Sequence, residues 1–179
     1  MGRVISRGPQ NILSHSIALG NAYWTCNGDA AFTSGQSDPR GGTKAFLFSS
    51  TVGGWANRCY GVTERHEGGP WCLCFRLKAG TEDQFRARVW NGTAYELDAT
   101  FNLATLATTL TVGSGAVIRD IGNSFYECYV YDTNLDSQGN ITVNFYNVGA
   151  GNLVIYCPQM NQGAVPDQIV ETREVALSP

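Results

Sequence analysis

The sequence predicts an all-β protein built as a sandwich or a barrel, and its composition and periodicity carry the prediction. Charged residues make up 15% of the 179-residue chain and glycine occurs 21 times, whereas typical soluble domains are about 25% charged. Short segments with alternating apolar and polar residues recur along the chain and are separated by turns rich in Gly, Pro and Asn. These features are typical of many short antiparallel strands.

The N-terminal part is expected to form an arm followed by short strands. Residues 1–10 hold no periodic apolar pattern and predict an extended N-terminal arm. Residues 11–179 are expected to form one sandwich domain, because a chain of this length can bury about two thirds of its unfolded surface. Within it, Ala22–Cys26 and Ala45–Phe48 predict strands, and the Gly- and Pro-containing segment Ser34–Thr43 predicts a turn between them.

The clearest strand signal lies between Trp71 and Lys78. Four large apolar residues at every second position predict one face turned toward the core. The opposite face ends in Arg76 and Lys78 and is expected to meet solvent. A shorter strand is predicted just before it, at Cys59–Val62. The four core-facing residues are Trp71, Leu73, Phe75 and Leu77.

A hairpin is predicted after this strand. Phe85–Trp90 alternates strictly, and Ala94–Leu97 can pair back on it. Asn91-Gly92 between them is the dipeptide that favours a tight type I′ turn. The sequence therefore places Trp90 and Tyr95 on either side of one turn.

The C-terminal half predicts further strands at regular spacing. Phe101–Val112 fits both helical and strand spacing, but its threonines favour a strand-rich segment. Pro158 cannot donate to a ladder and is expected to end the last strand, after which Ile169 and Val170 are expected to hold the tail against the body. The other predicted strands are Ala116–Ile121, Phe125–Tyr131, Ile141–Tyr146 and Leu153–Cys157.

Charge and cysteine usage exclude several classes of protein. The net charge of -3 without any cluster of Lys or Arg argues against nucleic-acid binding. The N-terminus lacks the apolar core of a signal peptide and no 18-residue apolar run is present, so we expect a chain made in the host cytoplasm that does not enter a membrane. The six unevenly placed cysteines favour reduced thiols over disulfides.

Catalytic and metal-binding motifs are missing, so we expect no enzyme, no cofactor and no metal site. His66 lies in a charged segment typical of a solvated loop. The pair Cys72 and Cys74 lacks the second ligand pair that a zinc site requires. Asp132 and its neighbours resemble half of a calcium loop, but Ser137 occupies the position that requires glycine. No nucleophile motif of a hydrolase occurs.

Aromatic residues beside polar turns are the better lead to a function. A flat ring can stack on the apolar face of a sugar while polar neighbours bind its hydroxyls. The alternative is that these rings simply fill the core, as Tyr and Trp often do in sandwiches. Tyr129 and Tyr131 belong to the same group of aromatic residues. The residues predicted to bind carbohydrate are Trp90, Tyr95, Trp55, Tyr60, Arg88 and Asn91.

Segments along nearly the whole chain carry a resemblance to a known family. The segments are, in chain order, Asn11–Ser14, Asn21–Trp24, Asp38–Gly42, Phe75–Thr81, Phe101–Leu103, Gly122–Tyr126, Ile155–Met160 and the ending at Ile169–Thr172. Together they resemble the carbohydrate-binding-module-like jelly-roll domains of bacteriophage tail and other virion proteins. The chain departs from that pattern at Cys128 and Cys157. The resemblance implies a jelly-roll sandwich of two antiparallel sheets and a place in the virion.

From the resemblance and the aromatic residues we predict a non-catalytic phage virion protein. Its jelly roll would be displayed on the particle and attach to host surface glycans, while residues 1–10 bind other virion proteins of the capsid or tail. A homo-oligomer is expected, and the family analogy favours a trimer. The alternative is a capsid decoration, or cement, protein that stabilises capsid subunits without recognising glycans. A polysaccharide depolymerase is a third hypothesis.

Overall fold

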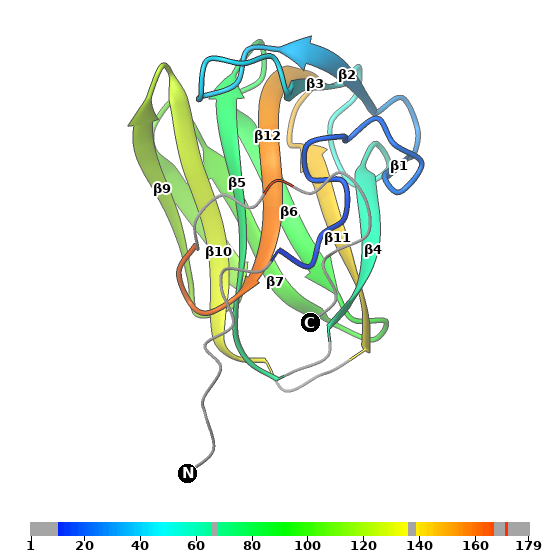
Figure 1. Ribbon diagram of the computed structural model, residues 1–179, viewed down its shortest axis with the longest axis vertical. Coiled ribbons are helices and arrows are strands. Elements are labelled where there is room, and N and C mark those ends of the chain that lie inside the picture. Colours follow the sequence, from blue (N-terminus) through cyan, green and yellow to red (C-terminus); the bar gives the residue numbers. More distant parts are fainter. Residues whose placement is uncertain (1–10, 66–67, 136–138, 167–170, 172–179) are drawn as a thin grey trace.

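The chain folds as a jelly-roll sandwich of two antiparallel sheets (Figure 1). The computed structural model describes residues 11–65, 68–135, 139–166 and 171. Sheet A contains, in spatial order, β1 (Thr25–Cys26), β4 (Cys59–Arg65), β11 (Gly139–Asn147), β6 (Gln84–Trp90), β7 (Tyr95–Asn102) and β8 (Ala107–Val112). Sheet B contains β2 (Ala31–Gln36), β3 (Ala45–Ser50), β12 (Gly151–Gln162), β5 (Gly69–Ala79), β10 (Phe125–Leu135) and β9 (Gly115–Gly122).

The predicted fold class and most predicted strands are confirmed. The ambiguous segment Phe101–Val112 holds the end of β7, a turn and β8, so the preference for strand over helix is correct. Two predictions at the N-terminal side are wrong. Strand β2 extends to Gln36 and overlaps the predicted turn, and only Thr25 and Cys26 of the predicted segment form a strand. Both β1 and β2 are sheet edges with little buried surface, so alternation along the sequence is a poor guide to where they begin and end.

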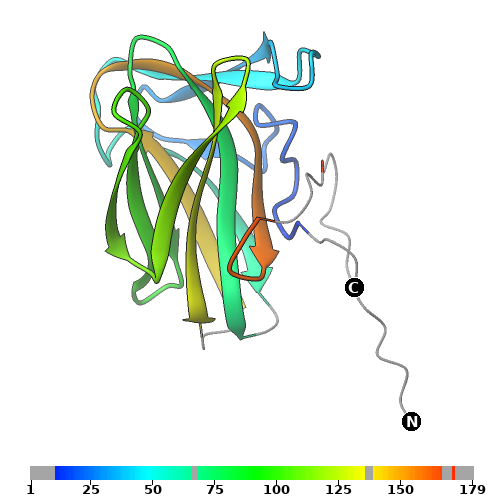
Figure 2. The same cartoon turned by 90° about the vertical axis from the view of Figure 1, so that its left-hand side faces the viewer.

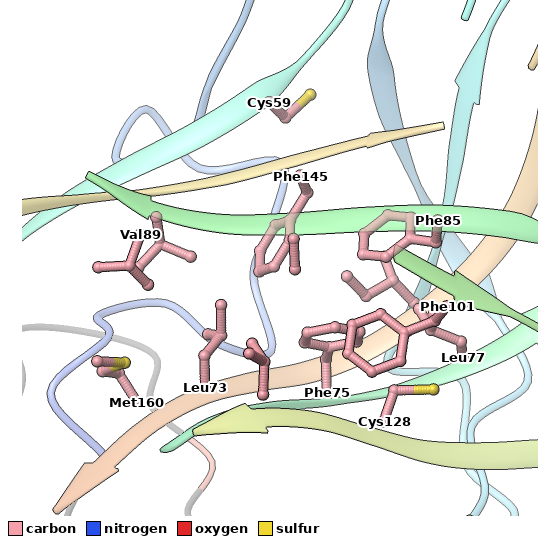
Figure 3. Close-up of a cluster of buried hydrophobic side chains, with 14 of the residues drawn as sticks. Cys59, Leu73, Phe75, Leu77, Phe85, Val89, Phe101, Cys128, Phe145 and Met160 are labelled. Atoms are coloured by element: carbon pink, nitrogen blue, oxygen red, sulfur yellow. The ribbon is translucent and has the colours of Figure 1, made fainter. Parts of the chain in front are cut away.

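Five phenylalanines fill the space between the sheets. Phe75 of β5 lies at the centre, with its ring centroid 5.3–5.5 Å from those of Phe85, Phe101 and Phe145 (Figure 3). Phe48 extends the cluster with a centroid 5.8 Å from Phe85. The edge-to-face contacts that dominate here match the preferred geometry of aromatic pairs. All four apolar residues predicted on one face of β5 are buried in this core.

The other face of β5 is less exposed than the sequence predicts. Arg76 was expected in solvent, but its side chain is 2% exposed and pairs with Glu127 of β10, Nη2 to Oε1 at 2.8 Å. Its Nη1 donates to Gln159 Oε1 at 2.7 Å. The N-terminal segment after residue 10 lies beside β12, where Ile17 packs in one cluster with Tyr156 and Cys157 (Figure 2). A residue that alternates with core residues is thus buried as well, because polar side chains of the neighbouring strands β10 and β12 pair with it.

Strand β12 continues through Pro158, contrary to the predicted end of the strand. Cys157 has a positive φ of 46°, and the pairing with β5 shifts register between Tyr156 and Gln159. Such a bulge accommodates a proline because the residue without an N–H drops out of the ladder. The N-terminal segment closes over the bulge, where Asn11 Nδ2 donates to the carbonyl oxygen of Pro158 at 3.2 Å.

The cysteines also differ from the prediction of reduced thiols. Cys26 and Cys59 form a disulfide, since they lie directly opposite each other on β1 and β4. Spacing along the sequence does not reveal such a pair, because cross-strand register decides it. The remaining cysteines are buried thiols, and burial raises the pKa of Cys74 to about 12. The four buried thiols are Cys72, Cys74, Cys128 and Cys157.

Several predictions fall outside the described residues. They concern the N-terminal arm at 1–10, the tail contact at Ile169 and Val170, and the loop residues His66 and Ser137. Among the described residues, no helix is long and apolar enough to cross a membrane.

Gly61 permits two aromatic rings to lie against β4, and this predicts a measurable loss of stability. A Cβ at Gly61 would lie 2.6 Å from Cε1 of Tyr23 and 3.2 Å from the ring of Trp24. Gly61→Ala is therefore expected to lower the free energy of unfolding by about 1–3 kcal/mol through overpacking, measured by urea denaturation. Gly20→Ala is the matched control, since its Cβ would meet Phe46 at an ordinary 3.7 Å. Equal stability of the two variants would contradict the prediction.

Candidate functional site

A pocket of about 360 Å³ opens on the outer face of sheet A. This volume lies in the usual range for small-molecule sites. The lining side chains come from the loop before β4 and from four neighbouring strands. We call this site the aromatic pocket, and its residues are Trp55, Arg58, Tyr60, Trp90, Tyr95, Thr142 and Asn144.

Strand pairing explains why these side chains meet. Tyr60 on β4 lies opposite Asn144 on β11, and Thr142 on β11 lies opposite Trp90 on β6. Paired residues point to the same side of a sheet. The alternate residues of these strands point into the core, so the pocket residues must point outward.

A register shift between β6 and β7 brings Tyr95 into the pocket. Val89 pairs with Leu97, yet the next residue, Trp90, pairs with Tyr95 rather than with Glu96. Trp90 and Tyr95 consequently share a face, with ring centroids 4.9 Å apart. The predicted hairpin is confirmed, but the type I′ turn is wrong because Asn91 does not have the positive φ that this turn requires.

Trp55 forms a wall of the pocket from the loop before β4. Gly53 lets that loop approach β11, since a Cβ there would lie 2.1 Å from the carbonyl oxygen of Val148. Gly54 has a φ of 97°, and its N–H donates to the carbonyl oxygen of Asn147 at 2.9 Å. The Trp55 ring then meets Tyr95 and Tyr146 edge to face, at centroid distances of 6.1 and 5.9 Å.

A network of charged side chains on β6 and β7 lies against the ring of Tyr95. Asp98 of β7 is 1% exposed. It accepts two hydrogen bonds from Arg86, at 2.7 and 2.8 Å, and one from Arg88 at 2.9 Å. The Arg88 guanidinium lies 4.6 Å from the Tyr95 ring centroid, and its Nη1 donates to the Tyr95 hydroxyl at 3.5 Å. This network holds Tyr95 in place.

The pocket gathers four of the six residues predicted to bind carbohydrate: Trp55, Tyr60, Trp90 and Tyr95. Arg88 contacts the rings of Trp55 and Tyr95 but is not among the lining residues. Asn91 is used by the hairpin itself, because its Oδ1 accepts hydrogen bonds from the N–H groups of Thr93 and Ala94 at 2.9 and 2.8 Å. Tyr129 and Tyr131 lie on β10 of sheet B and are not part of the pocket.

Sequence reasoning missed three lining residues. Thr142 and Asn144 could have been found, since they alternate with the apolar residues of the predicted strand Ile141–Tyr146. Arg58 has no such signal. Its guanidinium lies 4.0 Å from the ring centroid of Trp55 and 5.5 Å from that of Tyr60.

The lining combines flat aromatic surfaces with a few polar groups. The amide of Asn144, the hydroxyl of Thr142 and the guanidinium of Arg58 are hydrogen-bonding groups beside the rings. None of the seven lining residues is acidic, so the pocket lacks a carboxylate for acid–base chemistry. This composition suits the binding of a small, partly apolar ligand with hydroxyl groups.

No protein-family model matches the chain. No curated protein matches it either. Solved structures with similar folds do exist, and the three described next are 10–16% identical to this chain.

The xylan-binding domain CBM22-1 of Paenibacillus barcinonensis Xyn10C has a TM-score of 0.56 at 10% identity, with 90% of this chain and 99% of that chain covered. TmCBM61, in complex with beta-1,4-galactotriose, has a TM-score of 0.54 at 10% identity and covers 86% and 99%. The enzymatically active domain of bacteriophage CBA120 tailspike protein 4 has a TM-score of 0.55 at 16% identity, with 86% of this chain covered. This chain spans 21% of that tailspike chain. The fold is therefore a jelly roll like that of carbohydrate-binding modules.

Proposed function

We propose that this protein is a non-catalytic carbohydrate-binding domain and that the aromatic pocket holds the sugar. The observation that carries the proposal is the convergence of Trp55, Tyr60, Trp90 and Tyr95 in one pocket. These residues come from a loop and three different strands. Because stacking on a sugar requires flat apolar surface beside hydrogen-bonding groups, the lining has the composition that this ligand needs.

We further propose that the protein acts on a phage particle, where it attaches to host surface glycans. The resemblance to virion jelly rolls and the fold shared with a bacteriophage tailspike domain support this setting. An open pocket of this size binds one or two sugar units weakly, and several copies on one particle raise the overall avidity. Residues 1–10 would attach the domain to other virion proteins, and the copies would associate as a homo-oligomer such as a trimer.

A glycan array probed with the multimerised protein tests the sugar site. Trp90→Ala and Tyr95→Ala are each expected to weaken binding by about 30-fold, the effect of losing a residue that contributes about 2 kcal/mol. Tyr131→Ala is the matched control, because it removes a partly exposed ring from the other sheet and should leave binding unchanged.

The outcomes separate the competing functions. Absence of binding to every glycan would reject the sugar site and favour the cement-protein alternative. Binding that survives Trp90→Ala and Tyr95→Ala but is lost in Tyr131→Ala would place the site on sheet B. Release of reducing ends from host polysaccharide would contradict a non-catalytic role.

A further inference from the structure

We infer that the sugar bound in the aromatic pocket is acidic and that Arg58 binds its carboxylate. This inference rests on the proposed function and specifies its ligand class. It starts from an arginine whose charge no acidic side chain balances among the described residues. Three features of the pocket carry it: the contacts of Arg58, the charges around it and the hydrogen-bond donor that it keeps for a ligand.

The contacts of Arg58 leave its positive charge uncompensated. Its Nη1 donates to the carbonyl oxygen of Trp55 at 3.0 Å. The face of the guanidinium lies against the rings of Trp55 and Tyr60. Among the described residues Arg58 forms no ion pair, and its Nε is buried without a hydrogen-bond partner. A ligand carboxylate would balance this charge and accept a charged hydrogen bond, which is worth about 1.5–3 kcal/mol.

Two acidic side chains of β7, the strand that carries Tyr95, are engaged by other groups. Asp98 forms ion pairs with both Arg86 and Arg88. The three side chains together therefore carry a net charge of +1. Glu96 accepts a hydrogen bond from Asn91 Nδ2 at 3.1 Å, at the hairpin. The pocket therefore presents positive charge on a protein whose net charge is -3. Such a local reversal of sign attracts an anionic ligand.

Arg58 lines the pocket and keeps a hydrogen-bond donor for a ligand there. With Nη1 bound to Trp55 and Nε buried, Nη2 remains as the donor for a ligand in the pocket that Arg58 lines. A carboxylate accepts a short, charge-assisted hydrogen bond from such a group. In a uronic acid the carboxylate is attached directly to the sugar ring. One residue can thus stack on the aromatic rings while its acid group reaches the arginine beside Trp55.

A matched pair of glycans tests the inference. The probes are oligosaccharides of glucuronate, galacturonate, mannuronate and guluronate, together with sialylated and sulfated glycans. The strongest uronate binder is then compared with its carboxyl-reduced form, which keeps the sugar skeleton but lacks the charge. We expect carboxyl reduction to weaken binding to the intact protein about tenfold or more, as for loss of a charged hydrogen bond. Affinity is measured by isothermal titration calorimetry.

Arg58 variants connect this effect to the residue. Arg58→Gln is expected to bind the acidic glycan about tenfold less tightly and to bind the acidic and reduced forms almost equally. Arg58→Lys should retain a preference for the acidic form, because it keeps the charge. Arg119→Gln, which removes a 65% exposed arginine on sheet B, is the control and should bind like the intact protein. Thermal melts of each variant verify that the fold is intact.

Failure of the inference can be told apart from failure of the proposed function. Equal binding of the acidic and reduced glycans by the intact protein, with loss in Trp90→Ala, would reject the acidic ligand and retain the sugar site. A preference for sulfated over carboxylated glycans would also reject it. Discrimination that persists in Arg58→Gln would reject Arg58 as the recognising group. Absence of binding to any glycan would reject both proposals.

Discussion

Replacing Cys26 and Cys59 by alanine is expected to lower the free energy of unfolding by about 3–4 kcal/mol. The disulfide joins residues separated by 33 positions, and a cross-link over a loop of that length restricts the unfolded chain by about this amount. The effect is large because the loop contains β2, β3 and the whole segment that leads to the pocket. Urea denaturation of the intact protein and the double variant measures it.

The disulfide also stabilises one wall of the aromatic pocket. Cys59 lies between Arg58 and Tyr60, and the N–H of Asn27 donates to the carbonyl oxygen of Arg58 at 2.8 Å. The double variant is therefore expected to bind glycan less tightly as well as to unfold more easily. A reductant should destabilise the intact protein and have no further effect on the variant. Titration of six reactive thiols in the unfolded, unreduced protein would contradict the disulfide.

Arg76→Met is expected to cost about 3 kcal/mol of stability. Removal of one partner from a buried ion pair leaves the other charge uncompensated, at a typical cost of about 3–5 kcal/mol. We expect the lower end of this range of costs, because Glu127 keeps its ion pair with Arg119. Arg76 also contacts Gln159, so the variant leaves a second buried polar side chain with one partner fewer.

Two further variants make this prediction specific to the buried pair. Arg76→Met/Glu127→Leu should recover most of the lost stability, because apolar residues often replace a buried ion pair without loss. Lys78→Met is the control on the same face of β5, where the side chain is only partly buried, and should change stability by about 0.5 kcal/mol or less. Equal stability of Arg76→Met and Lys78→Met would contradict the account of the buried ion pair.

Local patterns identified most of the strands but not what lies against them. Alternation identified Trp71, Leu73, Phe75 and Leu77 as core residues, and all are buried. The same alternation placed Arg76 in solvent, because period 2 distinguishes two faces and cannot show that Glu127 and Gln159 of the neighbouring strands enclose the second. The contact between Asn11 and Pro158 spans 147 residues. Only tertiary structure reveals such a contact.

Some residues of the pocket could be predicted from the sequence, and others could not. Aromatic residues beside polar turns are conspicuous in the sequence, and strand register then brought Tyr60, Trp90 and Tyr95 together. Asn91 was predicted as a ligand because it lies in the polar turn between Trp90 and Tyr95. Its side chain instead accepts hydrogen bonds within that turn. Arg58 matters because of what lies around it in space, and nothing in its neighbourhood along the chain indicates that.

The indole N–H signals of the four tryptophans give the most direct test of the sugar site. Trp55 and Trp90 line the pocket, whereas Trp24 and Trp71 are only 5% and 4% exposed in the core. We expect the strongest glycan from the array to shift the NMR signals of Trp55 and Trp90 in a saturable manner and to leave those of Trp24 and Trp71 in place. Binding without any shift at Trp55 and Trp90 would contradict the aromatic pocket as the carbohydrate site.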